Sequence, residues 1–501
     1  MSLMKLKSGT DIRGTAIGEN IQLTDEAVQK ITLAFISYIS GKLGIEAENM
    51  TVCVGHDSRI SADRIKSAII GVLNALRVKV LDCSLSSTPA MFMTTVEGLC
   101  DVSIQITASH HPSDKNGLKF FTRDGSLEGE DIKNILTIAE NAVIPSLGDN
   151  TAQKTAFMSR YSEILRNKIK AEVNADNYEK PLEGFHIVVD AGNGAGGFFA
   201  TDVLEKLGAD VTGSQFLEPD GTFPNHIPNP ENEVAMSFIS RAVTDNNADL
   251  GVIFDTDVDR AACVDSSGNE INRNSLIALS SVMALEGNEG ATIVTDSVTS
   301  DGLKEFIECS LGGKHYRFKR GYKNVINKAI ELNKAGINCP LAIETSGHAA
   351  LRENYFLDDG AYLMTKIIIL AAKLRKENKT IDMLLKDLKK PLEEKEMRFK
   401  IELEDFKPCG EKVISDLEEY CKDFPFLTPA DDNREGFRVS FDKDHGNGWL
   451  LLRMSVHDPI LPLNIESNEE GGAKKIAEFF YDFIKEKENL DISAITKFLE
   501  K

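Results

Sequence analysis

Three aspartates occupy alternate positions directly after an apolar, strand-like segment. They are Asp255, Asp257 and Asp259 of the sequence DTDVDR. Alternate side chains of an extended chain point the same way, so three carboxylates repel one another unless a cation binds between them, and oxygen ligands favour Mg²⁺ or Ca²⁺. The segment is not an EF-hand, because Arg260 and Ser266 stand where that loop needs Gly and Glu. We interpret it as a metal site, with a solvated acidic turn as the alternative.

A serine lies in a polar turn that follows a second apolar segment. The sequence TASHHPSDKNGLKF places Ser109 beside His110 and His111, and Lys119 follows ten residues later. A hydroxyl is a poor nucleophile unless a base or a metal activates it, and these neighbours are of a type that could help. The G-x-S-x-G pattern of hydrolases is absent. The turn is therefore a candidate nucleophile loop, and an ordinary surface turn is the alternative.

A glycine-rich segment follows another predicted strand. Gly192, Gly194 and Gly197 in VVDAGNGAGG match G-x-G-x-x-G, and Asp210 follows about 18 residues after the first of them. This spacing is found in dinucleotide-binding turns. It also occurs where glycines only let a helix pack closely on its strand, so both interpretations stand on spacing alone.

Three further segments carry side chains that could bind a sugar or a phosphate, although each alone is also typical of a surface. AIETSGHAAL combines a carboxylate, a hydroxyl and an imidazole, RGYK places two cations beside a glycine, and SGTDIRG holds one arginine between turn residues. The candidate ligand residues of these segments are Glu344, Ser346, His348, Arg320, Gly321, Lys323 and Arg13.

The elements that must position these residues repeat one plan. Three stretches read strand, polar loop, helix, strand, and their first strands run into Asp57, Asp190 and Asp296. The helices of the second and third stretches end at Gly208 and Gly312, and glycine enters the left-handed conformation of a helix end cheaply. Such units build mixed, mostly parallel sheets covered by helices. We therefore predict three related α/β domains, although any α/β protein shows such units.

The last part of the chain has a different pattern. KEMRFKIELEDF, FRVSFD and GWLLLRMSV read as strands, and EKVISDLEEYCKDF and GGAKKIAEFFYDFIKEK read as helices. This pattern predicts a compact α+β module. We expect domain boundaries that divide the chain into 1–150, 151–271, 272–391 and 392–501.

Composition limits the classes of function. The 501 residues carry a net charge of −21, so most of the surface repels a nucleic-acid backbone, while one cleft could still be locally basic. No apolar run is long enough to cross a membrane, and the N-terminal residues lack the apolar region of a signal peptide. The eight cysteines show no metal-type spacing. We expect a cytoplasmic protein that binds neither nucleic acid nor membrane.

Four motifs occur together in one order: SGTDIRG, TASHHPxxxNGLK, DTDVDR and ETSGH. In order and spacing the chain resembles the α-D-phosphohexomutases, the phosphoglucomutase/phosphomannomutase superfamily, over nearly its whole length. The resemblance implies four domains around a central cleft, each contributing one loop. It also implies that the glycine segment is a structural turn, which argues against NAD binding.

The resemblance assigns roles to individual residues. It implies that Ser109 is the phosphoserine and a ligand of Mg²⁺ together with Asp255, Asp257 and Asp259. The positions matching its cationic active-site residues are Arg13, Lys119 and Arg260, and Lys119, His110 and His111 remain alternatives for the general acid/base. The residues expected to bind sugar or phosphate are Glu344, Ser346, His348, Arg320, Gly321, Lys323, Arg453, Ser455 and His457.

The sequence departs from the family pattern at two places. His111 stands two residues after the serine, where Asn is usual. The C-terminal phosphate loop, Arg-x-Ser-x-Thr-Glu-Pro in the family, is RMSVHDP here, so Arg453 and Ser455 are kept while His457 and Asp458 replace Thr and Glu. The substrate of a branch with this loop does not follow from the motif.

The implied reaction interconverts hexose 1-phosphate and hexose 6-phosphate, of glucose, mannose or both, through a phosphoserine enzyme and a hexose 1,6-bisphosphate that also acts as activator. The expected cofactor is Mg²⁺, the expected partners are sugar phosphates, and the expected state is monomer or homodimer. Alternatives are a phosphoserine- and metal-dependent phosphatase, a bisphosphate synthase, or a non-catalytic sugar-phosphate-binding relative.

Overall fold

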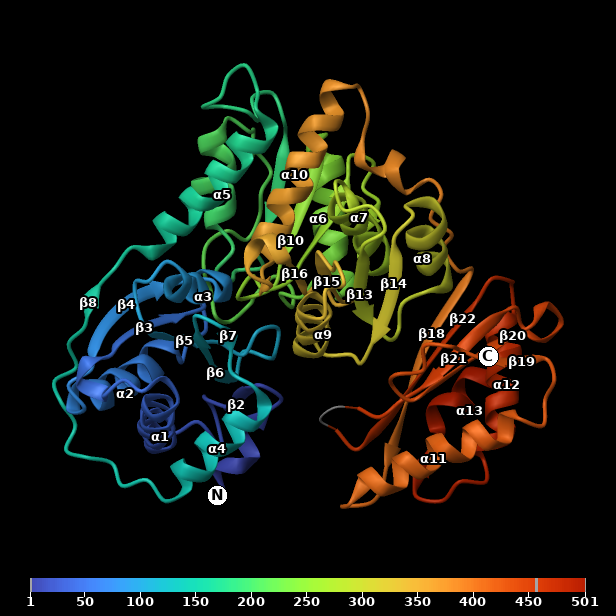
Figure 1. Ribbon diagram of the computed structural model, residues 1–501, viewed down its shortest axis with the longest axis horizontal. Coiled ribbons are helices and arrows are strands. Elements are labelled where there is room, and N and C mark those ends of the chain that lie inside the picture. The colour runs from blue at the N-terminus through green and yellow to red at the C-terminus, as the bar shows by residue number, and fades with distance from the viewer. Residues whose placement is uncertain (1, 456–457, 501) are drawn as a thin grey trace. The chain divides into compact units, whose positions relative to one another are not determined.

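The computed structural model describes residues 2–455 and 458–500 and contains two compact units (Figure 1). The first unit comprises the residues up to 283 together with 346–384. The second comprises 284–345 and the residues from 385 onward. Each unit is therefore built from segments that are discontinuous in the sequence.

The first sheet of the first unit combines parallel and antiparallel strands in the order β1-β2-β6-β5-β3-β4-β8, with β7 paired to β6. β5, β3, β4 and β8 run parallel, with Val52 opposite Val102, whereas β1, β2 and β6 pair antiparallel with their neighbours. The strands are β1 (Lys7–Ser8), β2 (Asp11–Thr15), β3 (Thr51–His56), β4 (Lys79–Leu85), β5 (Val102–Ile106), β6 (Lys115–Thr122), β7 (Gly125–Ser126) and β8 (Gln153–Lys154).

Helices cover both faces of this sheet. α1 (Asp25–Leu43), α2 (Ala62–Ala75) and α4 (Gly129–Glu140) lie on one face, where their apolar side chains form a core with the strands, and α3 (Thr88–Val96) lies on the other (Figure 1). Thr24 and Ser87 cap α1 and α3 by accepting a backbone N–H, which satisfies donors that a helix start leaves free.

The second sheet of this unit has the order β12-β11-β10-β9. β9 and β10 are parallel, and β10 turns back into β11 with Phe254 opposite Ala261. The side chains of Met236 and Ile239 on α6 pack against the sheet. The elements are α5 (Phe157–Val173), β9 (Ile187–Asp190), η3 (Phe199–Leu204), η4 (Glu205–Leu207), α6 (Glu233–Asn246), β10 (Leu250–Phe254), β11 (Ala261–Asp265), β12 (Glu270–Ile271) and α7 (Arg273–Leu285).

The returning segment 346–384 completes the first unit. It contains β16 (Ala349–Leu351), β17 (Leu357–Asp358) and α10 (Gly360–Lys376). α10 runs beside α5 (Figure 1), and the Tyr161 hydroxyl of α5 donates to Asp359, the N-cap of α10, at 2.7 Å. A buried hydrogen bond thereby joins two segments that are far apart in the sequence.

The second unit contains a parallel group of three strands and an antiparallel sheet. In the first group β13 (Thr292–Asp296) lies between β14 (Lys314–Phe318) and β15 (Leu341–Ile343), with α8 (Asp301–Glu305), η5 (Phe306–Ser310) and α9 (Tyr322–Lys334) as its helices. The antiparallel sheet has the order β19-β20-β21-β22-β18-β23. Its elements are β18 (Glu393–Ile401), α11 (Phe406–Cys421), β19 (Leu427–Pro429), β20 (Phe437–Phe441), β21 (Gly448–Leu452), β22 (Ile460–Ser467), α12 (Gly472–Ile484), β23 (Leu490–Asp491) and α13 (Ser493–Leu499).

The predicted fold class is confirmed: mixed α/β sheets precede a C-terminal α+β module. β22, which pairs with both β21 and β18, is an element that the sequence prediction lacked. Pro462 stands between Leu461 and Leu463 in its alternating apolar residues, and proline inside a run argues against a central strand. No helix within 2–455 and 458–500 has the length and apolar character needed to cross a membrane.

Candidate active site

Ser109 lies at the carboxyl end of parallel strands in the first unit. β3 and β5 end side by side, so Asp57 and Thr107 are adjacent, and the Thr107 hydroxyl donates to Asp57 Oδ2 at 2.7 Å. The backbone N–H of Ser109 donates to the same Thr107 hydroxyl at 2.9 Å, and Ser109 has a φ of 52°. A non-glycine residue in the left-handed region is uncommon and persists where its surroundings hold it there.

The acidic turn 255–260 joins β10 to β11, and its backbone is held from three sides. The carbonyl of Thr256 accepts from Ala195 N at 2.8 Å, and that of Asp257 accepts from Thr88 N at 2.8 Å. The carbonyl of Val258, a residue with φ 69°, accepts from Gly360 N at 3.1 Å. Three distant segments therefore fix successive residues of the turn in a conformation that its β-branched valine disfavours.

The three carboxylates of this turn converge. Asp255, Asp257 and Asp259 are at most 1% exposed, and each offers one oxygen within 4.8 Å of the others. Among the described residues, Asp257 Oδ1 and Asp259 Oδ1 are buried oxygens without a hydrogen-bond partner. A buried acceptor without a donor is costly, and a bound divalent cation removes that cost. The donor set, all hard oxygen, fits Mg²⁺ or Ca²⁺.

Ser109 lies beside this turn. Its hydroxyl donates to Asp255 Oδ2 at 2.9 Å, and its Oγ is 3.4 Å from His110 Nδ1. Burial raises the pKa of the Asp255 carboxyl, and the neighbouring charges of Asp259 and Asp257 raise it further. The serine predicted as nucleophile and the aspartates predicted as metal ligands are thus brought together from different segments.

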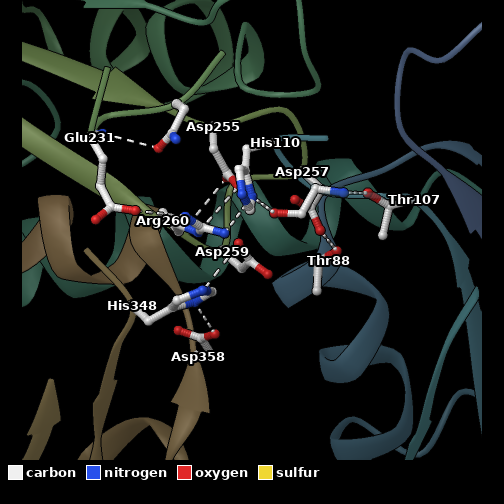
Figure 2. A network of polar contacts seen from close by, with 12 residues as sticks. Thr88, Thr107, His110, Glu231, Asp255, Asp257, Asp259, Arg260, His348 and Asp358 are labelled. Carbon is white, nitrogen blue, oxygen red and sulfur yellow. Dashed lines mark hydrogen bonds and ion pairs between the residues drawn. The ribbon is translucent and has the colours of Figure 1, made fainter. Parts of the chain in front are cut away.

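Two of the predicted cations neutralise part of the acidic charge. Lys119 on β6 is buried, with its Nζ bonded to Asp259 and 3.3 Å from Asp257 Oδ2. Burial alone would raise the pKa of Asp259, but Lys119 and His348 lower it. Arg260 Nη1 is 3.4 Å from Glu231 Oε2 (Figure 2).

The two histidines that follow Ser109 are both held neutral. Arg260 Nη2 bonds His110 Nδ1, and burial, followed by the charge of Arg260, lowers the pKa of His110 far below its usual value. Burial and Arg13 lower the pKa of His111 to about 3. Arg13 itself lies on β2 and pairs with Asp11 at 2.8 Å. Neither imidazole is positioned to be a cation at neutral pH.

His348 forms a pair that the sequence did not predict. Its Nδ1 is 2.6 Å from Asp358 Oδ2 and 4.0 Å from Asp259 Oδ1 (Figure 2). Burial would lower the pKa of His348, but the charges of Asp358 and Asp259 and the hydrogen bond to Asp358 together outweigh this and raise it. Ser346, two residues earlier, is 6% exposed in the same unit.

The remaining predicted residues belong to the second unit. Glu344 is buried and accepts from the backbone N–H of Gly321, which has a φ of 115° and precedes α9. Arg320 N donates to Glu435 at 3.1 Å, and Arg320 Nε is 3.8 Å from Asp296 Oδ2. Lys323 lies in the first turn of α9. The RGYK segment and Glu344 are thus brought together, as parts of one cluster.

The variant loop lies at the end of β21. Arg453 is 6% exposed, its Nη1 is 3.4 Å from the Met454 carbonyl, and its Nε is a buried nitrogen without a hydrogen-bond partner. Ser455 N donates to the Ile460 carbonyl at 2.9 Å. The predicted ligand His457 lies outside the described residues.

The glycine segment 192–197 lies close against neighbouring backbone, including that of the acidic turn. A Cβ on Gly194 would lie 2.5 Å from the carbonyl oxygen of Thr256, and one on Gly197 would lie 2.3 Å from that of Leu217. Only glycine permits these approaches. Gly194 packs the glycine segment against the acidic turn, and Gly197 packs it against Leu217, which favours the structural interpretation over a dinucleotide site.

Sequence reasoning missed several polar residues around the site. Arg59 bonds four carbonyls of the Ser109 loop, Thr88 Oγ1 bonds Asp257, and Asp358 bonds His348. The only sign of any of them in the sequence was Asp57, which stands at a predicted strand end two residues before Arg59. The others act across the fold, so no spacing in the sequence marks them.

Family models match most of the chain. The descriptions are phosphoglucomutase/phosphomannomutase, alpha/beta/alpha domain I for residues 4–143, domain II for 159–268 and domain III for 272–392. Together they include Ser109, the acidic turn and Glu344.

Whole-chain relatives agree with these matches. Phosphomannomutase/phosphoglucomutase of Pseudomonas syringae pv. tomato is 28% identical over 95% of this chain and 94% of its own. Phosphoglucomutase/phosphomannomutase of Thermococcus kodakarensis is 29% identical over 96% and 99%. The crystal structure of a phosphoglucomutase/phosphomannomutase family protein from Burkholderia thailandensis has a TM-score of 0.78 at 26% identity, covering 97% of this chain and 98% of that one. The chain belongs to the phosphoglucomutase/phosphomannomutase family within the α-D-phosphohexomutase superfamily.

Proposed function

We propose that this chain is a phosphohexomutase that interconverts hexose 1-phosphate and hexose 6-phosphate, of glucose, mannose or both. The observation that carries the proposal is the Ser109 hydroxyl, which donates to Asp255 Oδ2 at 2.9 Å beside two buried carboxylate oxygens without partners. A nucleophilic hydroxyl next to a cation site is what phosphoryl transfer requires. The names of the relatives, which pair mannose with glucose, support the substrate class.

The residues that would hold Mg²⁺ are Asp255, Asp257, Asp259 and Ser109 once it is phosphorylated. When bound, Mg²⁺ supplies positive charge to the oxygens of the transferred phosphoryl group. Lys119 and Arg260 add two fixed cations next to the same carboxylates. Such a site stabilises transferring phosphate mainly by charge, since this reaction needs little covalent help from the protein.

The proposed transfer has two halves. In the first, the bond between phosphorus and Ser109 Oγ breaks and a bond from phosphorus to a hydroxyl oxygen of the hexose phosphate forms, giving hexose 1,6-bisphosphate. The hydroxyl proton passes to a base, and the released Ser109 Oγ takes a proton. In the second half the bisphosphate, turned end for end, returns its other phosphoryl group to Ser109 Oγ, which gives up its proton, and the released sugar oxygen takes a proton. Phosphate is conserved over the cycle, so trace hexose 1,6-bisphosphate suffices to keep the enzyme phosphorylated.

Lys119 is the general acid/base that the geometry favours among the three candidates. The pKa of His111 is lowered to about 3 and that of His110 further, so both imidazoles are weak bases. Lys119 instead lies against Asp257 and Asp259, within the acidic turn. A proton acceptor must lie close to the reacting oxygen, and Lys119 contacts two of the three converging carboxylates while the third accepts from the Ser109 hydroxyl.

The other predicted ligands have the chemistry for a sugar phosphate. We assign Glu344 and Ser346 to sugar hydroxyls, with His348 beside them. Phosphate suits permanent cations with hydroxyl and backbone donors, and the residues we assign to it are Arg13, Arg320, Gly321, Lys323, Arg453, Ser455 and His457.

Product analysis tests the proposal. The purified protein is incubated with glucose 1-phosphate or mannose 1-phosphate, Mg²⁺ and trace glucose 1,6-bisphosphate, and phosphorus NMR follows the products. We expect hexose 6-phosphate, with no rise in inorganic phosphate. Release of phosphate without isomer would instead indicate a phosphatase, accumulation of bisphosphate a synthase, and unchanged substrate with measurable binding a non-catalytic relative.

A further inference from the structure

Arg59 is a buried guanidinium for which the proposed reaction has no direct use. Its side chain has no exposed surface, although arginine is rarely fully buried without a specific partner. It follows β3 and precedes α2, in the segment that begins with Asp57. The guanidinium is planar and presents its donors in a fixed fork, so a set of acceptors around it is held in a defined geometry.

Four backbone carbonyls of one loop converge on this fork. Nη1 donates to Pro112 O at 2.6 Å and to Lys115 O at 2.8 Å, and Nη2 donates to the carbonyls of Ser109 and His111. All four belong to the segment 109–115 between β5 and β6, which has no helix or strand until Lys115 begins β6. A loop without regular structure must find partners for its carbonyls elsewhere, and this one finds a partner for four of them on a single side chain.

Asp57 extends the same arrangement to the other side of Ser109. Its Oδ1 accepts from Arg59 N at 3.0 Å, and its Oδ2 accepts from the Thr107 hydroxyl, to which Ser109 N donates. The amide of Ser109 is therefore fixed through Thr107, and its carbonyl is fixed by Arg59. Both peptide groups that flank the left-handed serine are held.

The loop between η4 and α6 packs against Arg59. The ring of Phe223 lies 5.3 Å from the guanidinium carbon. A Cβ on Gly221 would lie 2.5 Å from Ser58 O and 2.7 Å from the Cα of Arg59, so this backbone lies directly on the arginine segment. The guanidinium cannot move away without disturbing both loops.

We propose that Arg59 is a positioning residue for phosphoryl transfer: it holds the loop 109–115 in the path that directs Ser109 Oγ at Asp255. It touches neither the sugar nor the reacting phosphate. A misplacement of a reacting group by about 1 Å can cost about 100-fold in rate, so a residue of this kind affects kcat more than KM. The inference rests on the proposed function only for its kinetic consequence; the ordering of the loop stands independently.

The test compares Arg59→Lys with Arg64→Lys. Lysine keeps the charge but cannot bond four carbonyls. Arg64 is the matched control, because it also donates to two backbone carbonyls in the first unit, those of Ala16 and Leu23, both at 2.9 Å, and neither carbonyl belongs to the segment 109–115. With glucose 1-phosphate, Mg²⁺ and glucose 1,6-bisphosphate, well below the melting temperature, we expect Arg59→Lys to lower kcat about 10- to 100-fold with KM changed less than about threefold. Arg64→Lys should keep both.

Amide hydrogen exchange provides the readout that needs no activity. In Arg59→Lys the peptides covering 107–118 should exchange at least about tenfold faster, while those covering 249–260 keep the wild-type rate. A variant with wild-type kcat, even at a lower melting temperature, would overturn the proposal, as would unchanged exchange in the loop. If the wild type isomerises nothing, the proposed function is wrong. The role of Arg59 in ordering the loop is then decided by whether the loop exchanges faster in Arg59→Lys than in wild type.

If Arg59→Lys does not fold, a second variant, Thr107→Val, tests the same arrangement. Thr107→Val removes the hydroxyl that links Ser109 N to Asp57 while nearly keeping the side-chain volume. We expect kcat to fall about tenfold and loop exchange to quicken, with KM held. If Thr107→Val retains full kcat, the arrangement around Arg59 does not position the serine and the inference is wrong.

Discussion

The acidic residues of the two units differ in how their carboxylates are satisfied. In the first unit, Asp257 Oδ1 and Asp259 Oδ1 are buried without a hydrogen-bond partner. In the second unit, Glu344 accepts from Gly321 N, Glu435 accepts from Arg320 N, and Asp296 accepts from the Thr345 hydroxyl at 2.7 Å. One cluster has spare acceptors, whereas the acids of the other hold backbone and hydroxyl donors in place.

Buried carboxylates therefore have two different roles in this chain: some are placed to bind a cation, and others hold the backbone. Converging carboxylates with spare oxygens are unfavourable alone and become favourable with a cation, which makes the first cluster suited to metal-assisted chemistry. Acids that accept from the backbone of the RGYK segment instead fix the shape of the segment that carries Arg320 and Lys323, two of the residues we assign to phosphate. Chemistry and recognition are therefore expected to respond differently to mutation.

The largest expected effect comes from Ser109→Ala. Removing the nucleophile should lower turnover by at least about 10⁴-fold, because it removes the hydroxyl that donates to Asp255. Intact-mass measurement should find no phosphoenzyme, while calorimetry finds sugar-phosphate affinity within about threefold of wild type. Ser103→Ala, a buried serine on β5 that donates to Met91 O, is the control and should keep activity. Normal turnover by Ser109→Ala would rule out the assigned nucleophile.

Metal binding to the acidic turn is the next test. With Mg²⁺ at 100 times its Kd, wild type should gain about 2.7 kcal/mol of stability, measured by thermal unfolding, and Asp257→Asn should lose most of this gain. Without metal, Asp257→Asn should change stability by less than about 1 kcal/mol, because relieved repulsion offsets the lost pairing with Lys119.

Asp265→Asn is the matched control for the metal test. Asp265 is also buried, at the end of β11, but it accepts from Ser267 N and Asn269 N. This variant should lose stability and retain the response to Mg²⁺. Full activity of the wild type in excess EDTA would contradict a required metal.

Mutation of the proposed phosphate ligands in the second unit, the recognition cluster (Arg320, Gly321, Lys323, Arg453 and Ser455), should change KM. Arg453 is buried with an unpartnered Nε, as expected of a residue that binds an anion. Arg453→Gln should raise KM for hexose phosphate about 10- to 100-fold, the value of one or two charge-assisted hydrogen bonds, with kcat within about threefold. Arg398→Gln, an exposed arginine on β18 paired with Glu396, should leave both constants unchanged. A fall in kcat at constant KM would remove the distinction between the two clusters.

The smallest expected effect concerns Glu466, a buried acid of the second unit that has a hydrogen-bond partner and still has a raised pKa. Burial raises the pKa of Glu466 to about 8, although Trp449 Nε1 donates to it at 2.8 Å. The native state then binds more protons than the unfolded state between the ordinary glutamate pKa and 8, so this residue lowers stability as pH rises through that window.

Glu466→Gln removes this titration and keeps an acceptor for Trp449. Its stability in urea, relative to wild type, should rise between pH 5 and pH 8 by roughly 1–3 kcal/mol, with little further change above. Parallel stability curves for the two proteins would mean that Glu466 titrates normally.

The sequence predicted those parts of the site that lie on one segment. DTDVDR indicated a metal turn because alternate carboxylates after a strand share a direction, and the structure brings those oxygens within 4.8 Å. Arg59, Thr88 and Asp358 could not be predicted in the same way, because each acts on a segment that only the folded chain brings near. The strand β22 was missed for a local reason, since Pro462 lacks the N–H that a central strand donates and so argues against one.

The way the acidic turn is held has a consequence for folding kinetics. Ala195, Thr88 and Gly360, which donate to its successive carbonyls, come from three regions of the sequence far from one another. Contacts of such long sequence separation form late, because closing the intervening chain costs entropy. A partly folded chain therefore has no assembled set of carboxylates to trap an ion. Refolding followed by stopped-flow fluorescence should proceed at the same rate with and without Mg²⁺, whereas unfolding should slow in its presence.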